Sequence, residues 1–188
     1  MKTMAILFSL LLVAATSFAA DWELDKGAVE LGGSIMFSSA SGDLYEYDGD
    51  GLTTFGIMPE VQYFIAPTFS LGGMISFLSL SQGDYSVSTF GIGPALYKYF
   101  GNSDGKTWPF VGAAFMFQST SMSNGDDEKI TGTTIHFTGG IAHKLVDHYI
   151  LKAGLYFDMD SMKGDWDDAE SESGSVFGLS VGFAGFVY

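Results

Sequence analysis

The side chains that could carry out nucleophilic or acid–base chemistry are few in this sequence. The 188-residue chain contains three histidines, His136, His143 and His148, and no cysteine. Nucleophilic catalysis needs a nucleophile and a base within hydrogen-bond reach of each other. Thr138, and not a serine, stands two residues after His136. We therefore expect no catalytic residues and no cofactor, and we expect neighbouring hydroxyl groups to satisfy the His136 imidazole.

Clustered carboxylates are the second set of residues that could bind a ligand. Two acidic runs stand between apolar segments: Asp43, Glu46, Asp48 and Asp50, and then Asp165, Asp167, Asp168, Glu170 and Glu172. Alternating carboxylates suit hard cations such as Ca²⁺, but the twelve-residue spacing of an EF-hand is absent. A run of like charges is usually a solvated segment. The main interpretation is solvated acidic loops, and the existence of a metal site stays open.

The elements that position these side chains show alternation with a period of two, which is typical of β-strands with two different faces. Eight nine-residue segments carry the pattern, at 29–37, 55–63, 69–77, 90–98, 109–117, 135–143, 149–157 and 177–185. Nine residues at about 3.3 Å each, tilted by about 40°, cross roughly 23 Å, which matches the apolar band of a membrane barrel. Aromatic residues stand at both ends of several segments, as in the girdles at membrane interfaces.

The two faces of these segments differ in composition. One face is bulky and apolar, and its only charged residue is Lys98 at a strand end. The other face is rich in Gly, Ala and Ser, and it holds Glu30, Glu60, Lys152 and His136. A water-soluble barrel would turn its bulky residues inward, so here the bulky face must meet lipid and the small residues must fill a narrow interior. The sequence predicts an all-β fold, an eight-stranded antiparallel up-and-down transmembrane β-barrel.

The charged residues of the small-residue face suggest a polar network in the lumen, made of Glu30, Glu60, Lys152 and His136. The first, second and seventh segments are near one another in a closed ring of eight. Glu30, Glu60 and Lys152 stand at similar depths in those segments. A buried charge without a partner is costly. We therefore expect Lys152 to bridge the two glutamates and side chains to fill the lumen.

The connections between the segments alternate in length. Short ones lie at 65–68, 102–105 and 146–148, and longer acidic ones lie at 39–51, 121–129 and 161–174. In bacterial barrels the short turns face the periplasm and the long loops face the exterior. Pro59 and Pro94 stand inside two of the segments, where proline indicates an edge strand or a bulge, and we expect a bulge at each.

The amino-terminal residues have the pattern of a secretory signal peptide. Lys2 precedes an apolar run at 5–15, and small residues lead to an expected cleavage site after Ala19. We predict three regions: a cleaved signal peptide at 1–19, a short lead at 20–27, and a barrel at 28–188. Without Lys2 the chain has 7 basic and 22 acidic residues, a formal charge of 7 − 22 = −15. Nucleic acid is excluded as a partner, because phosphate contacts need Lys and Arg.

Three short motifs carry a resemblance to a known family. They are Pro59–Phe64 leading into a short turn, Phe69–Gly72 after that turn, and the aromatic carboxyl end Phe186–Tyr188. Together with the pattern over residues 28–188, they resemble the outer membrane protein beta-barrel domain family, the OmpX- and OmpA-type eight-stranded barrels. The resemblance implies a monomer in the cell outer membrane of a Gram-negative bacterium. It also implies outer-membrane lipid, lipopolysaccharide and, through the C-terminal strand, the barrel assembly machinery as partners.

Three functional interpretations follow. The main one is a small outer-membrane barrel with a side-chain-filled lumen and acidic extracellular loops, acting as a structural or surface-interaction protein. The alternative is a narrow pore or a carrier of small ligands. A lipid A-modifying enzyme comes third. Similar barrels with that activity carry a His and a Ser together on one strand face, whereas here Thr138 stands where that Ser would be. Bridging of divalent cations between the acidic loops and lipopolysaccharide phosphates also stays open.

Overall fold

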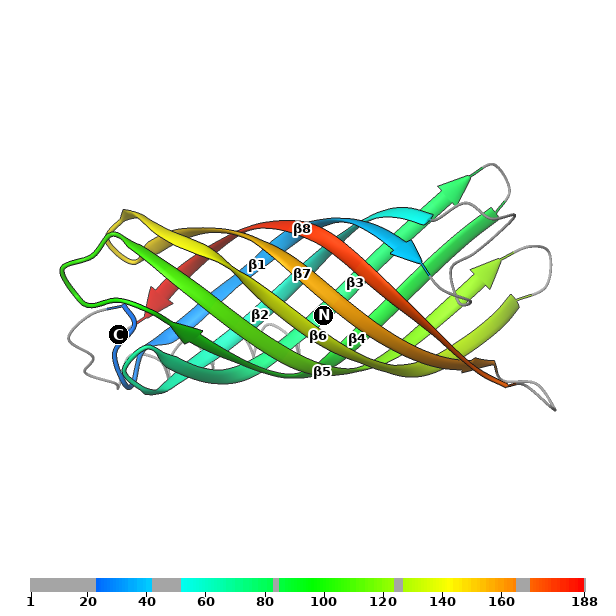
Figure 1. The fold of residues 1–188 in the computed structure, drawn as a ribbon, viewed down its shortest axis with the longest axis horizontal. Coiled ribbons are helices and arrows are strands. Elements are labelled where there is room, and N and C mark those ends of the chain that lie inside the picture. The colour runs from blue at the N-terminus through cyan, green and yellow to red at the C-terminus, as the bar shows by residue number, and fades with distance from the viewer. Residues whose placement is uncertain (1–22, 42–51, 83–84, 124–126, 165–169, 188) are drawn as a thin grey trace, which may run out of the picture.

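Eight strands in chain order make up the computed structural model, which describes residues 23–41, 52–82, 85–123, 127–164 and 170–187 (Figure 1). They are β1 Val29–Ser41, β2 Leu52–Ala66, β3 Phe69–Gln82, β4 Tyr85–Tyr99, β5 Thr107–Ser123, β6 Asp127–Val146, β7 Tyr149–Gly164 and β8 Ser171–Val187. Each strand pairs antiparallel with the next, and β1 pairs with β8 to close the barrel. The predicted eight-stranded up-and-down barrel is confirmed. The predicted signal peptide lies outside the described residues.

Side chains alternate between the outside and the inside of the barrel, as a pleated strand requires. The outward set is apolar and exposed, for example Phe117 at 60% and Phe177 at 55%. Lys98, a charged residue of this face near the end of β4, reaches the turn before β3, where its Nζ donates a hydrogen bond to Thr68 Oγ1 at 2.6 Å. A continuous apolar belt therefore surrounds the barrel. In the part of the chain that the structure describes, no helix is long and apolar enough to span a bilayer.

Glycines allow neighbouring strands to pack closely in this narrow barrel. A Cβ atom on Gly72 of β3 would overlap the carbonyl oxygen of Val61 on β2. A Cβ atom on Gly93 of β4 would overlap the carbonyl oxygen of Phe115 on β5 in the same way. Any other residue at these two positions would push the strands apart. Close backbone approach is thus one reason for the high glycine content of the chain.

Pro59 of β2 and Pro94 of β4 do not lie at bulges, so that prediction is wrong. Each proline keeps a partner on one side, Gly33 of β1 for Pro59 and Gly73 of β3 for Pro94. On the other side, no residue of β3 is paired with Pro59 and no residue of β5 is paired with Pro94. Beyond each proline the pairing resumes in the same register. Proline has no backbone N–H, so one hydrogen bond between the strands is missing. The loss of that hydrogen bond does not require the extra residue that a bulge would insert. The register shifts instead beside two of the turns.

The strands are longer than the nine-residue segments that the sequence predicts. β5 continues to Ser123, β6 starts at Asp127, β7 continues to Gly164 and β8 starts at Ser171. Much of the predicted loops at 121–129 and 161–174 is therefore strand. The apolar alternation stops where the outward residues become polar, although the backbone pairing continues.

Short turns close one end of the barrel, which we call the turn end. Residues 67–68 join β2 to β3, residues 100–106 join β4 to β5, and residues 147–148 join β6 to β7. Thr68 and His148 have φ angles of 62° and 69°, the left-handed conformation that such tight turns use. The opposite end is the loop end, where β1, β3, β5 and β7 end and β2, β4, β6 and β8 begin.

Candidate functional site

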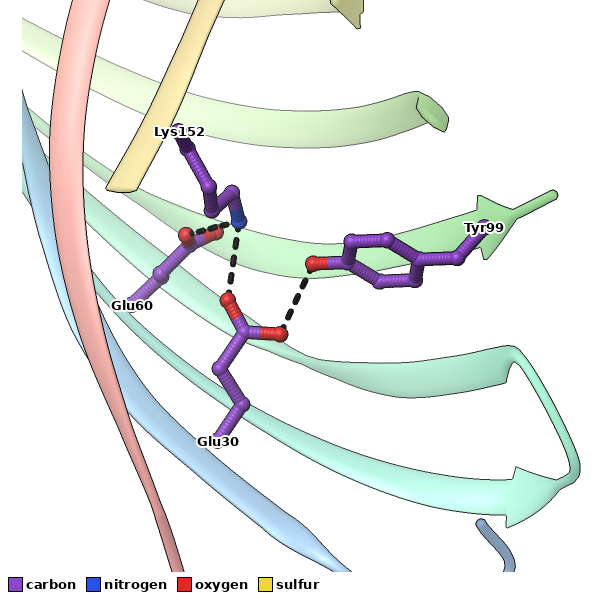
Figure 2. Close-up of polar contacts among 4 residues, drawn as sticks. All are labelled: Glu30, Glu60, Tyr99 and Lys152. Carbon is purple, nitrogen blue, oxygen red and sulfur yellow. Dashed lines mark hydrogen bonds and ion pairs between the residues drawn. The ribbon is translucent and has the colours of Figure 1, made fainter. Parts of the chain in front are cut away.

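A charged cluster crosses the lumen near the turn end. Lys152 Nζ of β7 lies 2.9 Å from Glu30 Oε1 of β1 and 2.6 Å from Glu60 Oε1 of β2 (Figure 2). All three side chains are buried, and Glu30 is completely inaccessible. The structure thus brings together three of the four residues of the predicted lumen network.

The order of strands around the ring explains why these charges meet. β7, β8, β1 and β2 are consecutive in the closed barrel. On β8, Gly182 lies opposite Lys152, and on β1, Gly32 lies opposite Glu60. Because neither glycine fills the lumen, Lys152 can extend across β8 toward the two carboxylates.

Aromatic side chains enclose the cluster. The Tyr99 hydroxyl donates a hydrogen bond of 2.8 Å to Glu30 Oε2. Lys152 Nζ lies 4.4 Å from the centre of the Tyr97 ring and 5.4 Å from that of Phe110, within the range of cation–π attraction. Sequence reasoning missed Tyr99 because it lies one residue beyond the predicted segment 90–98. Its inward parity is the signal that could have identified it.

His136 lies in a second cluster, not with the three charges. Its Nδ1 is 2.5 Å from Asp158 Oδ1, and its ring stacks on Tyr156 with centres 5.6 Å apart. Nearby, the Thr134 hydroxyl donates a hydrogen bond to Asp160. The expectation that hydroxyl groups satisfy His136 is therefore wrong. Asp158 and Asp160 were missed because they lie beyond the predicted segment 149–157, although they continue its inward parity.

The space left in the lumen beside the charged cluster is small. One cavity of about 20 Å³ lies there, which is room for about one water molecule. It is lined by both Glu60 and Lys152 and by Gly33, Ser34, Met58, Tyr97, Phe110, Thr138, Ser180 and Gly182. A ligand larger than water does not fit in this cavity.

Residues 23–28, which we call the strap, lie across the turn end ahead of β1. The Thr68 N–H, in the turn between β2 and β3, donates a 2.6 Å hydrogen bond to the Leu24 carbonyl. Lys144 Nζ, at the end of β6, lies 2.6 Å from Glu23 Oε1. Thr68 belongs to the hairpin of β2 and β3, and Lys144 belongs to the hairpin of β6 and β7. These two hairpins are on opposite sides of the ring of eight strands. The strap therefore spans the opening of the barrel.

The strap places an apolar side chain in that opening. Leu24 is completely buried. It belongs to the apolar cluster that fills the lumen, together with Phe64, Tyr99, Trp108, Ile150 and Phe186. Leu24 therefore packs with side chains from the strands in one buried cluster.

The charge at the end of the strap is held by an ion pair. Burial raises the pKa of the Glu23 carboxyl, but hydrogen bonds from Lys144 and from backbone N–H groups, together with the positive charge of Lys144, outweigh burial, and the pKa lies below its ordinary value. Lys144 also lies 3.0 Å from Asp147, whose pKa is lowered by the same hydrogen bond and charge. Both carboxylates are therefore ionised at neutral pH.

Metal binding stays a prediction about the loops. Among the residues that the structure describes, no three His, Asp or Glu side chains are placed to hold a metal ion. The predicted acidic residues at 43–50 and 165–168 lie outside the described residues. Glu170 and Glu172 are exposed at the start of β8.

Comparisons with known proteins identify relatives in fold. No family model matches the chain, and no curated protein sequence matches it. Neisserial surface protein A (NspA) matches with a TM-score of 0.69 and 16% identity, over 85% of this chain and 99% of that one. The outer membrane protein OprG from Pseudomonas aeruginosa matches with a TM-score of 0.53 and 13% identity, over 88% and 99%.

A third solved structure shares the same architecture. Ail, the attachment invasion locus protein of Yersinia pestis, in complex with the heparin analogue sucrose octasulfate, matches with a TM-score of 0.50 and 11% identity, over 84% of this chain and 97% of that one. All three are eight-stranded outer-membrane barrels. The closed barrel and the exposed apolar belt together make this chain an eight-stranded β-barrel of the bacterial outer membrane.

Proposed function

We propose that this protein is a small outer-membrane barrel with a closed lumen, acting as a structural or surface-interaction protein and not as a channel. The observation that carries the proposal is the charged cluster, in which Lys152 joins Glu30 and Glu60 across the lumen. Eight strands enclose only enough space for side chains. An ion that passed through would have to break these buried contacts.

The strap supports the same function from the turn end. It holds Leu24 in the opening through the Thr68 and Lys144 contacts. The fold also supports a surface role, because two relatives in fold are named a surface protein and an attachment invasion locus protein. We place the turn end in the periplasm and the acidic loop end outside, since short turns face the periplasm in such barrels.

We further propose that the barrel is a monomer without enzymatic activity. The Nδ1 atom of His136 is engaged by a carboxylate, and its ring lies against Tyr156, an arrangement that stabilises the imidazole without a nucleophile.

The C-terminal strand β8 presents Phe177, Leu179, Val181 and Phe183 outward. This apolar stripe is the surface we propose for contact with the barrel assembly machinery.

Ion conductance tests the closed lumen. Purified protein in planar lipid bilayers should give no steady single-channel current, and Lys106→Met, a substitution in an exposed turn, should behave like the wild type. Steady wild-type currents that are unchanged in Lys152→Met would show an open path that bypasses the cluster. That result would favour the narrow pore.

A further inference from the structure

Methionine side chains project into the middle of the lumen from β1, β2, β3 and β5. All of them are buried and belong to the same apolar cluster. A thioether is a flexible apolar group that fills gaps in a core, and it is also a soft ligand for copper(I). We call these residues the methionine layer: Met36, Met58, Met74 and Met116.

Strand register brings three members of the methionine layer together on one wall of the lumen. Met58 of β2 lies opposite Ser34, two residues before Met36 of β1. Met74 of β3 lies opposite Glu60, two residues after Met58 of β2. Residues in such diagonal positions on one face of a sheet are within reach of each other when their side chains are long. The three thioethers are therefore neighbours.

His136 lies on the opposite wall, beside the fourth methionine. Met116 of β5 lies opposite Thr134, two residues before His136 of β6. In the closed ring of eight strands, β6 is opposite β2. His136 therefore has Met116 as a diagonal neighbour and faces the other three methionines across a narrow lumen.

The methionine layer and His136 lie at nearly the same depth in the barrel. Paired residues followed from strand to strand around the barrel from Val29 lead back to β1 at Ser39, ten positions further on. With this rise over eight strands included, each methionine lies within about two residues, or roughly 5 Å, of His136 along the barrel axis. The four thioethers and the imidazole thus form one layer across the lumen.

The His136 imidazole has one nitrogen held and the other unused. Nδ1 lies 2.5 Å from Asp158 Oδ1, and the carboxylate accepts the Nδ1 hydrogen. The neutral ring then carries its lone pair on Nε2. Nε2 is buried and has no hydrogen-bond partner among the residues that the structure describes, and the residue is only 1% exposed. A carboxylate on the second ring nitrogen is also what orients histidines that bind metals.

The carboxylates near this layer favour a cation and do not by themselves provide a site for a hard one. Asp158 and Asp160 follow Tyr156 on β7 toward the loop end, and the Asp158 side chain is 13% exposed. Their negative charge attracts cations that enter from that end. Asp158 is bonded to His136 and Asp160 to Thr134, and within the described strands no three His, Asp or Glu side chains converge. The unused ligands are therefore the soft ones.

We propose that His136 Nε2 and the thioethers of the methionine layer bind a copper(I) ion in the middle of the lumen. Thioether and imidazole ligands select copper(I) over hard cations. All these ligands are neutral, so binding releases no ligand proton and transfers no electron, and Asp158 compensates the charge of the ion. Methionine side chains have three rotatable bonds, so they can close around an ion without a preformed cavity. The inference goes beyond the closed lumen proposed above, because the ion is held and not conducted.

The first test uses the wild-type barrel and Ag⁺ alone, a soft ion that is stable to oxidation. Folded protein in detergent, labelled with ¹³C in the methionine methyl groups and ¹⁵N in the histidines, is titrated with Ag⁺ and followed by NMR. The methyl resonances of the methionine layer and the Nε2 resonance of His136 should shift together in one saturable step. The methyl of Met159, which is 42% exposed on the lipid face, should stay in place. Copper(I), added with ascorbate in the absence of oxygen, should displace Ag⁺, and Ca²⁺ should cause no shift.

A methionine variant tests the same site by native mass spectrometry. Met36→Leu, Met58→Leu, Met74→Leu and Met116→Leu together keep the side-chain volume and remove the thioethers, so this variant should lose bound Ag⁺. The control Met159→Leu with Met162→Leu should retain as much Ag⁺ as the wild type, and heat-modifiable gel mobility checks that both variants fold.

Three results would overturn the proposal. Wild-type methyl resonances that stay in place would show that the thioethers only fill the lumen, and this measurement does not depend on the folding of any variant. Ag⁺ retained by the folded quadruple variant would place the ion elsewhere, as would an equal loss in the control. A shift of the methionine methyls without the His136 Nε2 resonance would exclude the imidazole as a ligand.

Discussion

At the scale of single residues, Lys152 is the cation that two buried carboxylates share. Lys152→Met keeps most of the side-chain volume and removes the charge, which leaves Glu30 and Glu60 unpaired unless they take up protons. We expect a loss of about 3 kcal/mol in the free energy of unfolding, measured by urea titration of the folded barrel. Combining it with Glu30→Gln and Glu60→Gln should recover much of the loss. A single variant as stable as the wild type would show that the pairing contributes nothing.

At the scale of the strand, β3 tests which face meets lipid. Ile75 points outward within the belt, and Ser76 points inward and is buried. Ile75→Arg should cost about 2–4 kcal/mol, because it places a charge in the hydrocarbon layer. Ser76→Arg should fail for a different reason, since the Ser76 hydroxyl already lies against Gly91 and leaves no room. Heat-modifiable gel mobility reports folding, and an Ile75→Arg barrel that folds like the wild type would reverse the assignment of the faces.

The strap is the second element whose contribution can be measured, through its pH dependence. The folded pKa of Glu23 lies below its ordinary value of 4.5, so its stabilising contribution is present above that value and is lost as the pH falls through the folded pKa. We expect about 1 kcal/mol from this ion pair. Hydrogen exchange of the Thr68 amide, which bonds to Leu24, should accelerate on acidification. In Glu23→Gln the exchange should be fast already at neutral pH, and an unchanged rate there would exclude the ion pair as the attachment.

At the scale of the whole molecule, the two ends of the barrel should face different compartments. Single cysteines placed at Ser171 or Ser173 should react with a membrane-impermeant label on intact cells, because both positions are exposed where β8 starts at the loop end. A cysteine at Asn102, in the turn between β4 and β5, should react only after the outer membrane is permeabilised. Labelling of Asn102 alone on intact cells would mean that the barrel is inserted the other way round.

The sequence by itself determined the strands, their faces and the closed arrangement. Alternation is a local property, since the pleat turns successive side chains to opposite sides whatever their partners are. Strands that have one bulky apolar face and one face of small residues fit a narrow barrel, with the small residues inside and the bulky face against lipid. The inward parity of Glu30, Glu60 and Lys152 could be recognised in the same way. The strand ends could not, because pairing continues into Ser-rich segments without an apolar signal.

Only the tertiary structure decided which inward side chains meet. Glu30 and Lys152 are 122 positions apart in the chain, and their contact depends on closure of β1 onto β8 and on the space left by Gly182. Parity indicates that a residue faces the lumen, but ring closure and strand register determine its partner. For that reason His136 pairs with Asp158 and Tyr99 reaches Glu30, contacts that no local pattern specifies.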